Sequence, residues 1–222
     1  MKIYLIGGLG ADERVFNYLK LNYATKSIKW IKPKPGEKLN CYAKRLSKQI
    51  NPDEEFGILG VSFGGIVAIE ISKHIKPAIL ILISSVETRK QLPQKYVLLG
   101  KTKILNMIPN WLIKPPQPIL NFLFGAKNKE LLKEIIRDTD SQFIRWALNA
   151  IINWSNETEF NEVIRIHGTK DKLIPLKGPA IKIINGGHFM IIDRAEEIST
   201  LINEQVKSAE NNDLENIKIN HP

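Results

Sequence analysis

The sequence has one cysteine, Cys41, among its 222 residues. This excludes an internal disulfide, and the chain is long enough to bury a sizeable core without one. A single free cysteine is typical of proteins from reducing compartments, so we expect a cytoplasmic protein. Cys41 stands among apolar residues of an expected helix, which predicts a small buried hydrophobic side chain there.

Long hydrophobic runs are also missing. No apolar segment approaches the roughly 20 residues that a membrane-spanning helix needs. The first six residues faintly resemble the beginning of a signal peptide, but the apolar part is short and charged residues follow at positions 12–14. We therefore expect a first strand. The composition, 43% hydrophobic and 25% charged, is that of a globular protein. The length of 222 residues fits one domain, or one domain with a small insertion.

Runs of like charge are absent, although the net charge is +9. The lysines are spread over almost every segment, and no stretch holds five or more consecutive basic residues. Aromatic residues do not alternate with arginines, as they do in proteins that bind single-stranded nucleic acid. We expect no nucleic-acid partner, and the positive charge leaves an anionic substrate or partner open. No cluster of cysteine and histidine has metal-ligand spacing, so we expect neither a metal nor another cofactor.

The most informative stretch is G-V-S-F-G over residues 60–64, with Ser62 at its centre. An apolar run precedes it at 56–59, and a helical pattern follows at 65–75. In the order strand, sharp turn, helix, G-x-S-x-G predicts a nucleophile elbow. Gly60 and Gly64 meet the need for small residues where the chain folds back on itself. The alternative is a glycine-rich strand end with an exposed serine.

A glycine-rich turn, G-G-L-G-A-D, follows the first expected strand at residues 7–12. A dinucleotide-binding turn has the pattern G-x-G-x-x-G, with a glycine or alanine at the last position. Here the pattern would begin at Gly8 and its last position is Glu13, so we reject that function. An oxyanion loop is the other explanation, because a flexible turn can point a backbone amide at a developing negative charge. Leu9 would supply one such N–H group. Phe63, which follows the serine, would supply the second.

The remaining periodicity predicts alternating strands and helices, which indicate a mostly parallel α/β sheet with helices on both faces. Strands are expected at residues 2–6, 26–31, 56–59, 78–84, 163–166 and 180–184. Helices are expected at residues 14–21, 37–50, 65–75, 119–124, 129–138, 141–154 and 195–209. The polar tail at 210–222 predicts a loose segment.

Residues 86–160 show no strand pattern, and their helical patterns are separated by proline-rich turns. We expect a helical cap here, inserted into a core made of residues 1–85 and 161–209. Aromatic residues are frequent in the cap, where they either pack against one another or line a substrate pocket. The candidates for substrate contact are Trp111, Phe143 and Trp146.

A serine hydroxyl needs a base to accept its proton. Of the four histidines, His188 follows the last expected strand, and two preceding glycines allow its ring to reach back. His74 lies about three helical turns from the serine, and His221 is in the tail. His167 ends a strand and is expected to shape the loop beside the acid.

The acid that orients the base is expected after a strand and before His188. Asp171 meets both conditions in H-G-T-K-D at residues 167–171, although the same turn also suits a structural aspartate. Asp138 and Asp140 are the fallback candidates, but both lie in the expected cap.

The order Ser62, Asp171, His188 is that of the α/β-hydrolases. From residue 3 to about 201, the chain resembles a small member of that superfamily, through the motifs at 7–10, 60–64, 167–171 and 186–188. Many relatives have His-Gly where this chain has Gly-Gly at positions 7–8. The chain also starts at what resembles the third strand of the family. The resemblance therefore implies the α/β-hydrolase fold with a sheet of about six strands.

The resemblance further implies acyl transfer through a covalent intermediate on Ser62, with a Ser-His-Asp triad and without a metal. The expected substrate is a small, partly apolar carboxylic ester or thioester. One alternative is C–C bond hydrolysis or elimination on an anionic metabolite, with Lys172 and Arg145 facing the cleft. Another is a protein that keeps the fold and binds a ligand without turnover.

Overall fold

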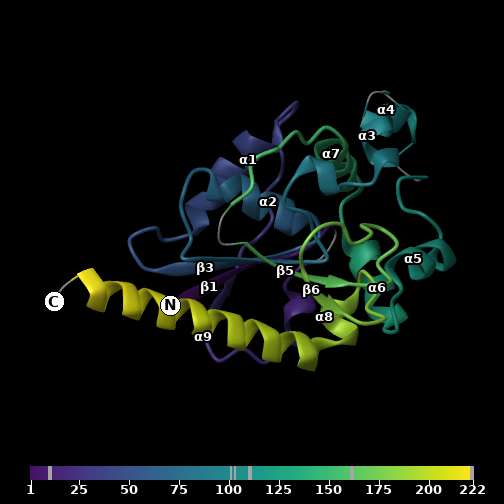
Figure 1. Cartoon of the computed structure of the whole chain (residues 1–222). Coiled ribbons are helices and arrows are strands. Elements are labelled where there is room, and N and C mark those ends of the chain that lie inside the picture. Colours follow the sequence, from purple (N-terminus) through teal and green to yellow (C-terminus); the bar gives the residue numbers. More distant parts are fainter. Residues whose placement is uncertain (10–11, 101, 103, 110–111, 161–162, 221–222) are drawn as a thin grey trace.

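One parallel sheet of six strands forms the centre of the molecule (Figure 1). The computed structural model describes residues 1–9, 12–100, 102, 104–109, 112–160 and 163–220. The strands lie in the order β2-β1-β3-β4-β5-β6, and each neighbouring pair runs parallel. Their bounds are β1 (Lys2–Ile6), β2 (Ala24–Ser27), β3 (Phe56–Val61), β4 (Ile79–Ile83), β5 (Val163–Gly168) and β6 (Ile181–Ile183). The predicted fold class, a sheet of about six mostly parallel strands, is confirmed.

The strand order reverses next to β1. The chain steps from β1 to β2 on one side and then returns to place β3 on the other side. In open parallel sheets, ligands bind outside the carboxyl ends of the strands at such a point. The glycine-rich turn follows β1 and Ser62 follows β3, so the fold brings both motifs to this edge of the sheet.

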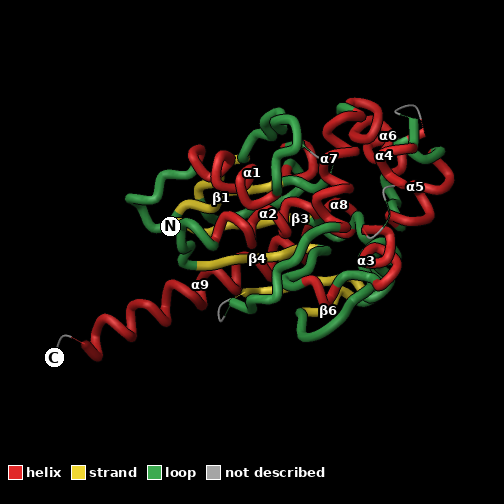
Figure 2. The backbone as a smooth tube through the Cα atoms, turned by 90° about the horizontal axis from the view of Figure 1, so that it is seen from above, coloured by secondary structure: helices red, strands yellow, loops and turns green. Residues whose placement is uncertain are grey.

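Two apolar cores cover the two faces of the sheet, and β1 shows how the sequence divides between them. Its successive residues alternate: Ile3 and Leu5 belong to one core, and Tyr4 and Ile6 to the other. Helices α1 (Leu39–Leu46), α2 (Phe63–Ser72) and α7 (Ser141–Ile152) cover one face. The other is covered by η1 (Glu13–Phe16), α6 (Lys129–Asp138), α8 (Met190–Asp193) and α9 (Ala195–Asn220). Figure 2 shows the molecule from above, with the helices over the sheet.

Between β4 and β5, the described residues form helices and no strand, as the sequence pattern predicts. Besides α6 and α7, these are η3 (Arg89–Gln91), α3 (Gln94–Gly100), α4 (Ile104–Met107) and α5 (Gln117–Phe124). We call residues 86–160 the cap. The sequence patterns missed α3, α4 and α8, each of which is shorter than two and a half turns.

Several expected boundaries differ from the structure. The strand expected at 26–31 is β2 at Ala24–Ser27, and of the helix expected at 14–21 only the short η1 forms. The helix expected at 37–50 is α1 followed by η2 (Ser47–Gln49). In the tail expected to be loose at 210–222, α9 continues to Asn220. Residues 210–220 are polar, but they contain no proline or glycine. Polar residues alone do not end a helix, so α9 continues through this segment.

Cys41 is exposed, which corrects the expectation of a buried side chain. The buried residues of α1 are Leu39, Tyr42, Ala43 and Leu46. They recur at helical spacing on one face, and position 41 lies on the other. Among the described residues, no helix is both long and apolar enough to span a bilayer.

Candidate active site

Ser62 stands at a strained turn between β3 and α2. Its backbone has φ 54° and ψ −119°, a conformation that is unusual for a residue with a side chain. The turn is tight: a Cβ atom on Gly64 would lie 2.2 Å from the carbonyl oxygen of Gly7, and one on Gly60 would lie 2.6 Å from that of Gly64. Small residues are therefore required on both sides of Ser62, as the G-x-S-x-G pattern predicts.

A second serine supports this turn from the neighbouring strand. Ser85 follows β4, and its hydroxyl donates to the carbonyl oxygen of Ser62 at 2.7 Å. A Cβ atom on Gly65 would lie 2.3 Å from the Ser85 Oγ atom, so the glycine makes room for this contact. Sequence reasoning did not find Ser85. Its signal is its position at the carboxyl end of the strand beside β3.

The structure brings together the three residues that the sequence predicted as a triad. The Ser62 hydroxyl lies 2.8 Å from Nε2 of His188, and Nδ1 of His188 lies 2.7 Å from Oδ2 of Asp171. A carboxylate only accepts hydrogen bonds, so Nδ1–H donates to it and Nε2 is free to accept from the hydroxyl. Ser62 is 126 residues from His188 along the chain, and the sheet edge unites them.

Asp171 is buried and held in its ionised form. Its Oδ1 atom accepts the amides of Leu173 at 3.0 Å and Ile174 at 2.8 Å. Burial on its own would raise the pKa of Asp171. Its charge interaction with His188, the hydrogen bonds from His167 and His188, and that of the Ile174 amide together lower the pKa below the usual range. The carboxylate therefore stays charged and orients His188 at neutral pH.

His167 is a second imidazole beside the acid. It is fully buried, with Nε2 lying 2.7 Å from the carbonyl oxygen of Ile174 and 3.4 Å from Oδ2 of Asp171. A carbonyl accepts, so Nε2 carries the proton. Nδ1 has no hydrogen-bond partner within the described part of the chain. His167 thus holds the loop that presents the acid, as the sequence reading expected.

The loop of His188 is gripped from two sides. The amide of Lys170, in the turn after β5, donates to the carbonyl of Gly186 at 2.9 Å. From the cap, the Phe124 carbonyl accepts the amide of Phe189 at 3.0 Å, and the Phe124 ring meets His188 edge to face, with 5.4 Å between the ring centroids. The cap thereby takes part in placing His188.

The predicted oxyanion residues lie next to Ser62. Phe63 is the first residue of α2, so its amide has no partner within the helix and points from the positive end of the helix dipole. Gly8 and Leu9 line the same cavity as Ser62. Residues 10 and 11 of this turn lie outside the described residues, and the oxyanion role of Leu9 and Phe63 stays a prediction.

An apolar cavity of about 310 Å³ opens onto Ser62 and His188. This volume falls in the range of small-molecule sites. Its wall is mostly aliphatic and comes from the cap and from the loops of the core. Besides Ser62 and His188, the wall residues with polar side-chain groups are Lys114 and Tyr96, and the Tyr96 hydroxyl donates to the Leu173 carbonyl at 2.9 Å. The cap residues in the wall include Tyr96, Leu99, Leu105, Ile113, Lys114, Leu120, Leu123, Phe124, Ile135, Ile144 and Leu148.

The predicted substrate residues Phe143 and Trp146 do not line this cavity, which corrects the sequence reading. Trp146 donates its indole N–H to the Glu37 carbonyl at 2.9 Å, and its ring lies 4.3 Å from that of Tyr42 between centroids. Phe143 packs on Trp30 at 5.3 Å. Both rings therefore join α7 to the core. Trp111 lies outside the described residues.

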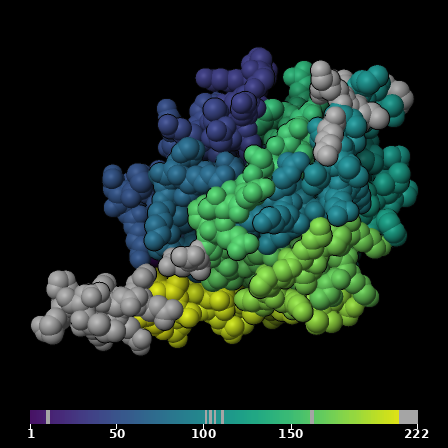
Figure 3. All heavy atoms as spheres, turned by 45° about the horizontal axis from the view of Figure 1, so that its top comes forward, coloured from purple at the N-terminus to yellow at the C-terminus, as the bar shows by residue number. Residues whose placement is uncertain are grey.

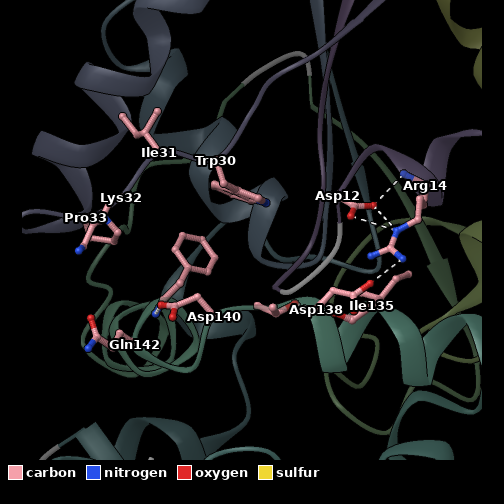
Figure 4. A pocket seen from close by; sticks show the side chains of 12 residues that line it. Asp12, Arg14, Trp30, Ile31, Lys32, Pro33, Ile135, Asp138, Asp140 and Gln142 are labelled. Carbon is pink, nitrogen blue, oxygen red and sulfur yellow. Dashed lines mark hydrogen bonds and ion pairs between the residues drawn. The ribbon is translucent and has the colours of Figure 1, made fainter.

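Two larger hollows lack the triad, and Figure 4 shows the one near residue 14, of about 490 Å³. In it Arg14 lies between two carboxylates, 2.8 Å from Asp12 and 3.0 Å from Asp138. Asp140 accepts the amide of Phe143 at 2.8 Å and caps α7. The fallback acids Asp138 and Asp140 thus have other partners, and Asp171 alone of the three aspartates contacts His188.

The cations expected to face the cleft do not line the cavity either. Lys172 is exposed, with its ammonium 3.4 Å from the centroid of the Phe122 ring. Arg145 donates to the carbonyls of Leu105 and Ile108 within the cap. Lys114 is the cation that lines the cavity, and it donates to the Arg137 carbonyl at 2.9 Å.

No family model and no curated protein matches this sequence. Solved structures do match over almost the whole chain. A putative aryl esterase from Burkholderia cenocepacia is 15% identical, with a TM-score of 0.70, 95% of this chain and 91% of that chain covered. MenH from S. aureus is 17% identical, with a TM-score of 0.68 and coverage of 95% and 94%. A thermophilic esterase from Thermogutta terrifontis is 14% identical, with a TM-score of 0.66 and coverage of 94% and 90%.

The chain has the α/β-hydrolase fold. At these identities the likeness concerns the fold alone, so the chemistry has to be argued from the site. In this fold, Ser62, Asp171 and His188 each follow a different strand and meet at the carboxyl edge of the sheet. Within the described residues, no group of three or more histidine, cysteine, aspartate or glutamate side chains is placed to hold a metal ion.

Proposed function

We propose that the protein is a serine hydrolase that cleaves a carboxylic ester or thioester through an acyl-enzyme. The observation that carries this proposal is the unbroken hydrogen-bonded series from Ser62 through His188 to Asp171 at the end of an apolar cavity. A hydroxyl, an imidazole and an ionised carboxylate in this order form the arrangement that activates serine for acyl transfer.

The reaction proceeds in two halves. Ser62 Oγ attacks the carbonyl carbon while its proton passes to Nε2 of His188. The bond to the leaving alcohol or thiol then breaks, and His188 delivers the proton to that group. Water attacks the acyl-serine, giving a proton to His188, and the carboxylic acid departs as Ser62 recovers its proton. Asp171 remains ionised throughout and stabilises the imidazolium.

The negative charge of each tetrahedral intermediate falls on the former carbonyl oxygen. We assign its stabilisation to the amides of Leu9 and Phe63. These groups are preorganised because one belongs to a helix N-terminus and the other to the turn packed against Gly64.

The cavity wall favours an aliphatic acyl group. The side chains next to Ser62 and His188 are mainly leucine and isoleucine, and Tyr96, Phe124 and Phe189 are the aromatic members of the wall. Burying each additional methylene is worth about 0.8 kcal/mol, or roughly a fourfold gain in kcat/KM per carbon until the cavity is filled.

A series of p-nitrophenyl esters of increasing acyl length tests the proposal, with Ser62→Ala as the control. We expect kcat/KM to rise with chain length and then level off, and Ser62→Ala to lower the rate at least about 10³-fold. Turnover that survives in Ser62→Ala would count against the proposal.

A second function is favoured by Lys114, the cation in the cavity wall, together with the net charge of +9. In this alternative, the same triad hydrolyses a C–C bond, or eliminates a group, in an anionic metabolite. Turnover of anionic metabolites without turnover of p-nitrophenyl esters would favour it. A ligand-binding protein without turnover remains the third hypothesis, and it requires Ser62→Ala to keep every cellular role.

A further inference from the structure

The cap carries most of the exposed apolar side chains whose burial the structure describes. Among these side chains, seven large hydrophobic ones are exposed, and five of them lie between positions 98 and 122. They are Leu98, Met107, Leu112, Ile119 and Phe122, and the exposure reaches 63% for Phe122 and 80% for Met107. Single exposed apolar residues are ordinary, but a concentration in one segment indicates an interaction site.

These residues belong to a wall that is apolar on both sides. Leu99, Leu120 and Leu123 line the cavity that ends at Ser62. The residues that precede them in the chain, Leu98, Ile119 and Phe122, are exposed to solvent. Likewise, Leu112 is exposed and the next residue, Ile113, lines the cavity. The same helical segments therefore present apolar side chains both to the cavity and to solvent.

Figures 1 and 2 place α3, α4 and α5 at the same end of the molecule, away from the free end of α9. In Figure 3 the teal segments of the cap likewise lie across the molecule from the yellow C-terminal helix. We call the exposed side chains of residues 94–129 that the structure describes the outer cap surface. The outer cap surface and the cavity wall are built from the same helices.

The outer cap surface belongs to a segment without acidic residues. Residues 94–129 contain six basic residues and no aspartate or glutamate, so they account for six of the nine net positive charges. The lysines are spread along the chain, and what sets this segment apart is the absence of acidic residues. Lys95, Lys127 and Lys129 are exposed.

We propose that the outer cap surface binds an anionic lipid surface. Exposed apolar side chains flanked by lysines are what such a surface selects, because the apolar groups enter the interface and the lysines meet the anionic headgroups. A second copy of this chain is disfavoured as the occupant, since it would bring a second set of positive charges into contact with the first. Nucleic acid would use the lysines but would leave the apolar side chains without a role.

The proposal goes beyond the hydrolase function. Binding to lipid needs no chemistry at Ser62. Measuring binding with Ser62→Ala, which leaves the vesicles unhydrolysed, separates lipid binding from the proposed hydrolysis.

The experiment is flotation of Ser62→Ala with vesicles of phosphatidylcholine alone and with vesicles containing one part phosphatidylglycerol in about three. We expect the protein to float with the anionic vesicles and to stay behind with the neutral ones. Raising the salt to about 1 M should release it at least partly, because screening weakens the contribution of the lysines. The proposal would be overturned if equal amounts of protein floated with both kinds of vesicle, or if no protein floated with either kind.

Paired variants locate the surface. Ile119→Ser and Lys127→Glu/Lys129→Glu should each lower the partition coefficient on anionic vesicles about tenfold. The matched controls Ile184→Ser and Lys44→Glu/Lys48→Glu change exposed residues outside the cap. They should leave the partition coefficient within about twofold of the Ser62→Ala value. Equal losses in the test variants and the controls would contradict a site on the cap.

Sedimentation velocity on the parent and on Phe122→Ser tests whether a second copy of the chain occupies the outer cap surface. We expect the oligomeric state to be the same for the parent and for Phe122→Ser. A dimer that dissociates in Phe122→Ser, together with no vesicle binding by the parent, would assign the outer cap surface to self-association and overturn the proposal.

Discussion

At the scale of single residues, the site depends on how Asp171 is supported. One oxygen accepts two backbone amides and the other accepts His188, so the carboxylate cannot rotate away from the imidazole. The direction in which Nδ1–H of His188 points is thereby set, and Nε2 is left as the acceptor for Ser62.

Asp171→Asn should lower kcat about 10³–10⁴-fold while the protein stays folded. The side-chain amide can donate to Nδ1 and would favour the imidazole with its proton on Nε2, which cannot accept from Ser62. Steady-state kinetics on a short ester, with circular dichroism as the check on folding, measures the effect. A variant within about tenfold of the parent would show that Asp171 does not orient the base.

His167 provides a second prediction. His167→Leu leaves the buried carbonyl of Ile174 without its donor, so the free energy of unfolding should fall by about 1–3 kcal/mol and kcat should fall with it. His167→Gln keeps an N–H donor and should recover part of both. Urea denaturation and kinetics are measured on both variants, and equal behaviour of the two would contradict a role through this hydrogen bond.

At the scale of elements, the elbow depends on the close contact between α2 and the turn after β1. Gly64→Ala would place a Cβ atom 2.2 Å from the Gly7 carbonyl oxygen, and that atom is backbone and cannot simply rotate aside. The oxyanion turn or the helix must shift, so we expect a loss of at least about 10²-fold in kcat, or of folding. Activity close to that of the parent would show that the contact is looser than the structure has it.

The contact between α7 and the core is separate from the cavity. Trp146→Phe keeps an aromatic ring but removes the indole N–H that donates to the Glu37 carbonyl, so the free energy of unfolding should fall by at least about 1 kcal/mol. Because Trp146 does not line the cavity, the preferred ester chain length should not change. A change in the preferred ester chain length would indicate that Trp146 contacts the substrate.

The sequence predicted the sheet elements and the triad because their signals are local. Apolar runs such as residues 79–83 mark buried strands, and Ser62, Asp171 and His188 each stand in a glycine-containing turn after a strand. The partners of the cap helices have no such signal. Trp146 and Phe124 are both aromatic residues of helical segments, yet one packs on the core and the other on His188. Tertiary packing decides which partner each of these rings contacts, and the sequence pattern of a single helix does not show it.

At the scale of the whole molecule, the same carboxylate links the site to stability. Because the pKa of Asp171 is lowered on folding, its ionised form contributes stability that is complete above the ordinary carboxyl pKa of about 3.9 and is lost as the pH falls below it. The free energy of unfolding should therefore decline more gently with acid in Asp171→Asn than in the parent below about pH 4. The control Asp53→Asn removes an exposed carboxylate and should keep the slope of the parent.

The central claim is that the hydroxyl of Ser62 is a nucleophile activated by His188 at the carboxyl edge of the sheet. Treatment with a fluorophosphonate, followed by mass spectrometry of the digested protein, tests it most directly. The account predicts one covalent adduct, on Ser62, and slower labelling in His188→Ala. An adduct on another residue, or no adduct in the folded protein, would contradict it.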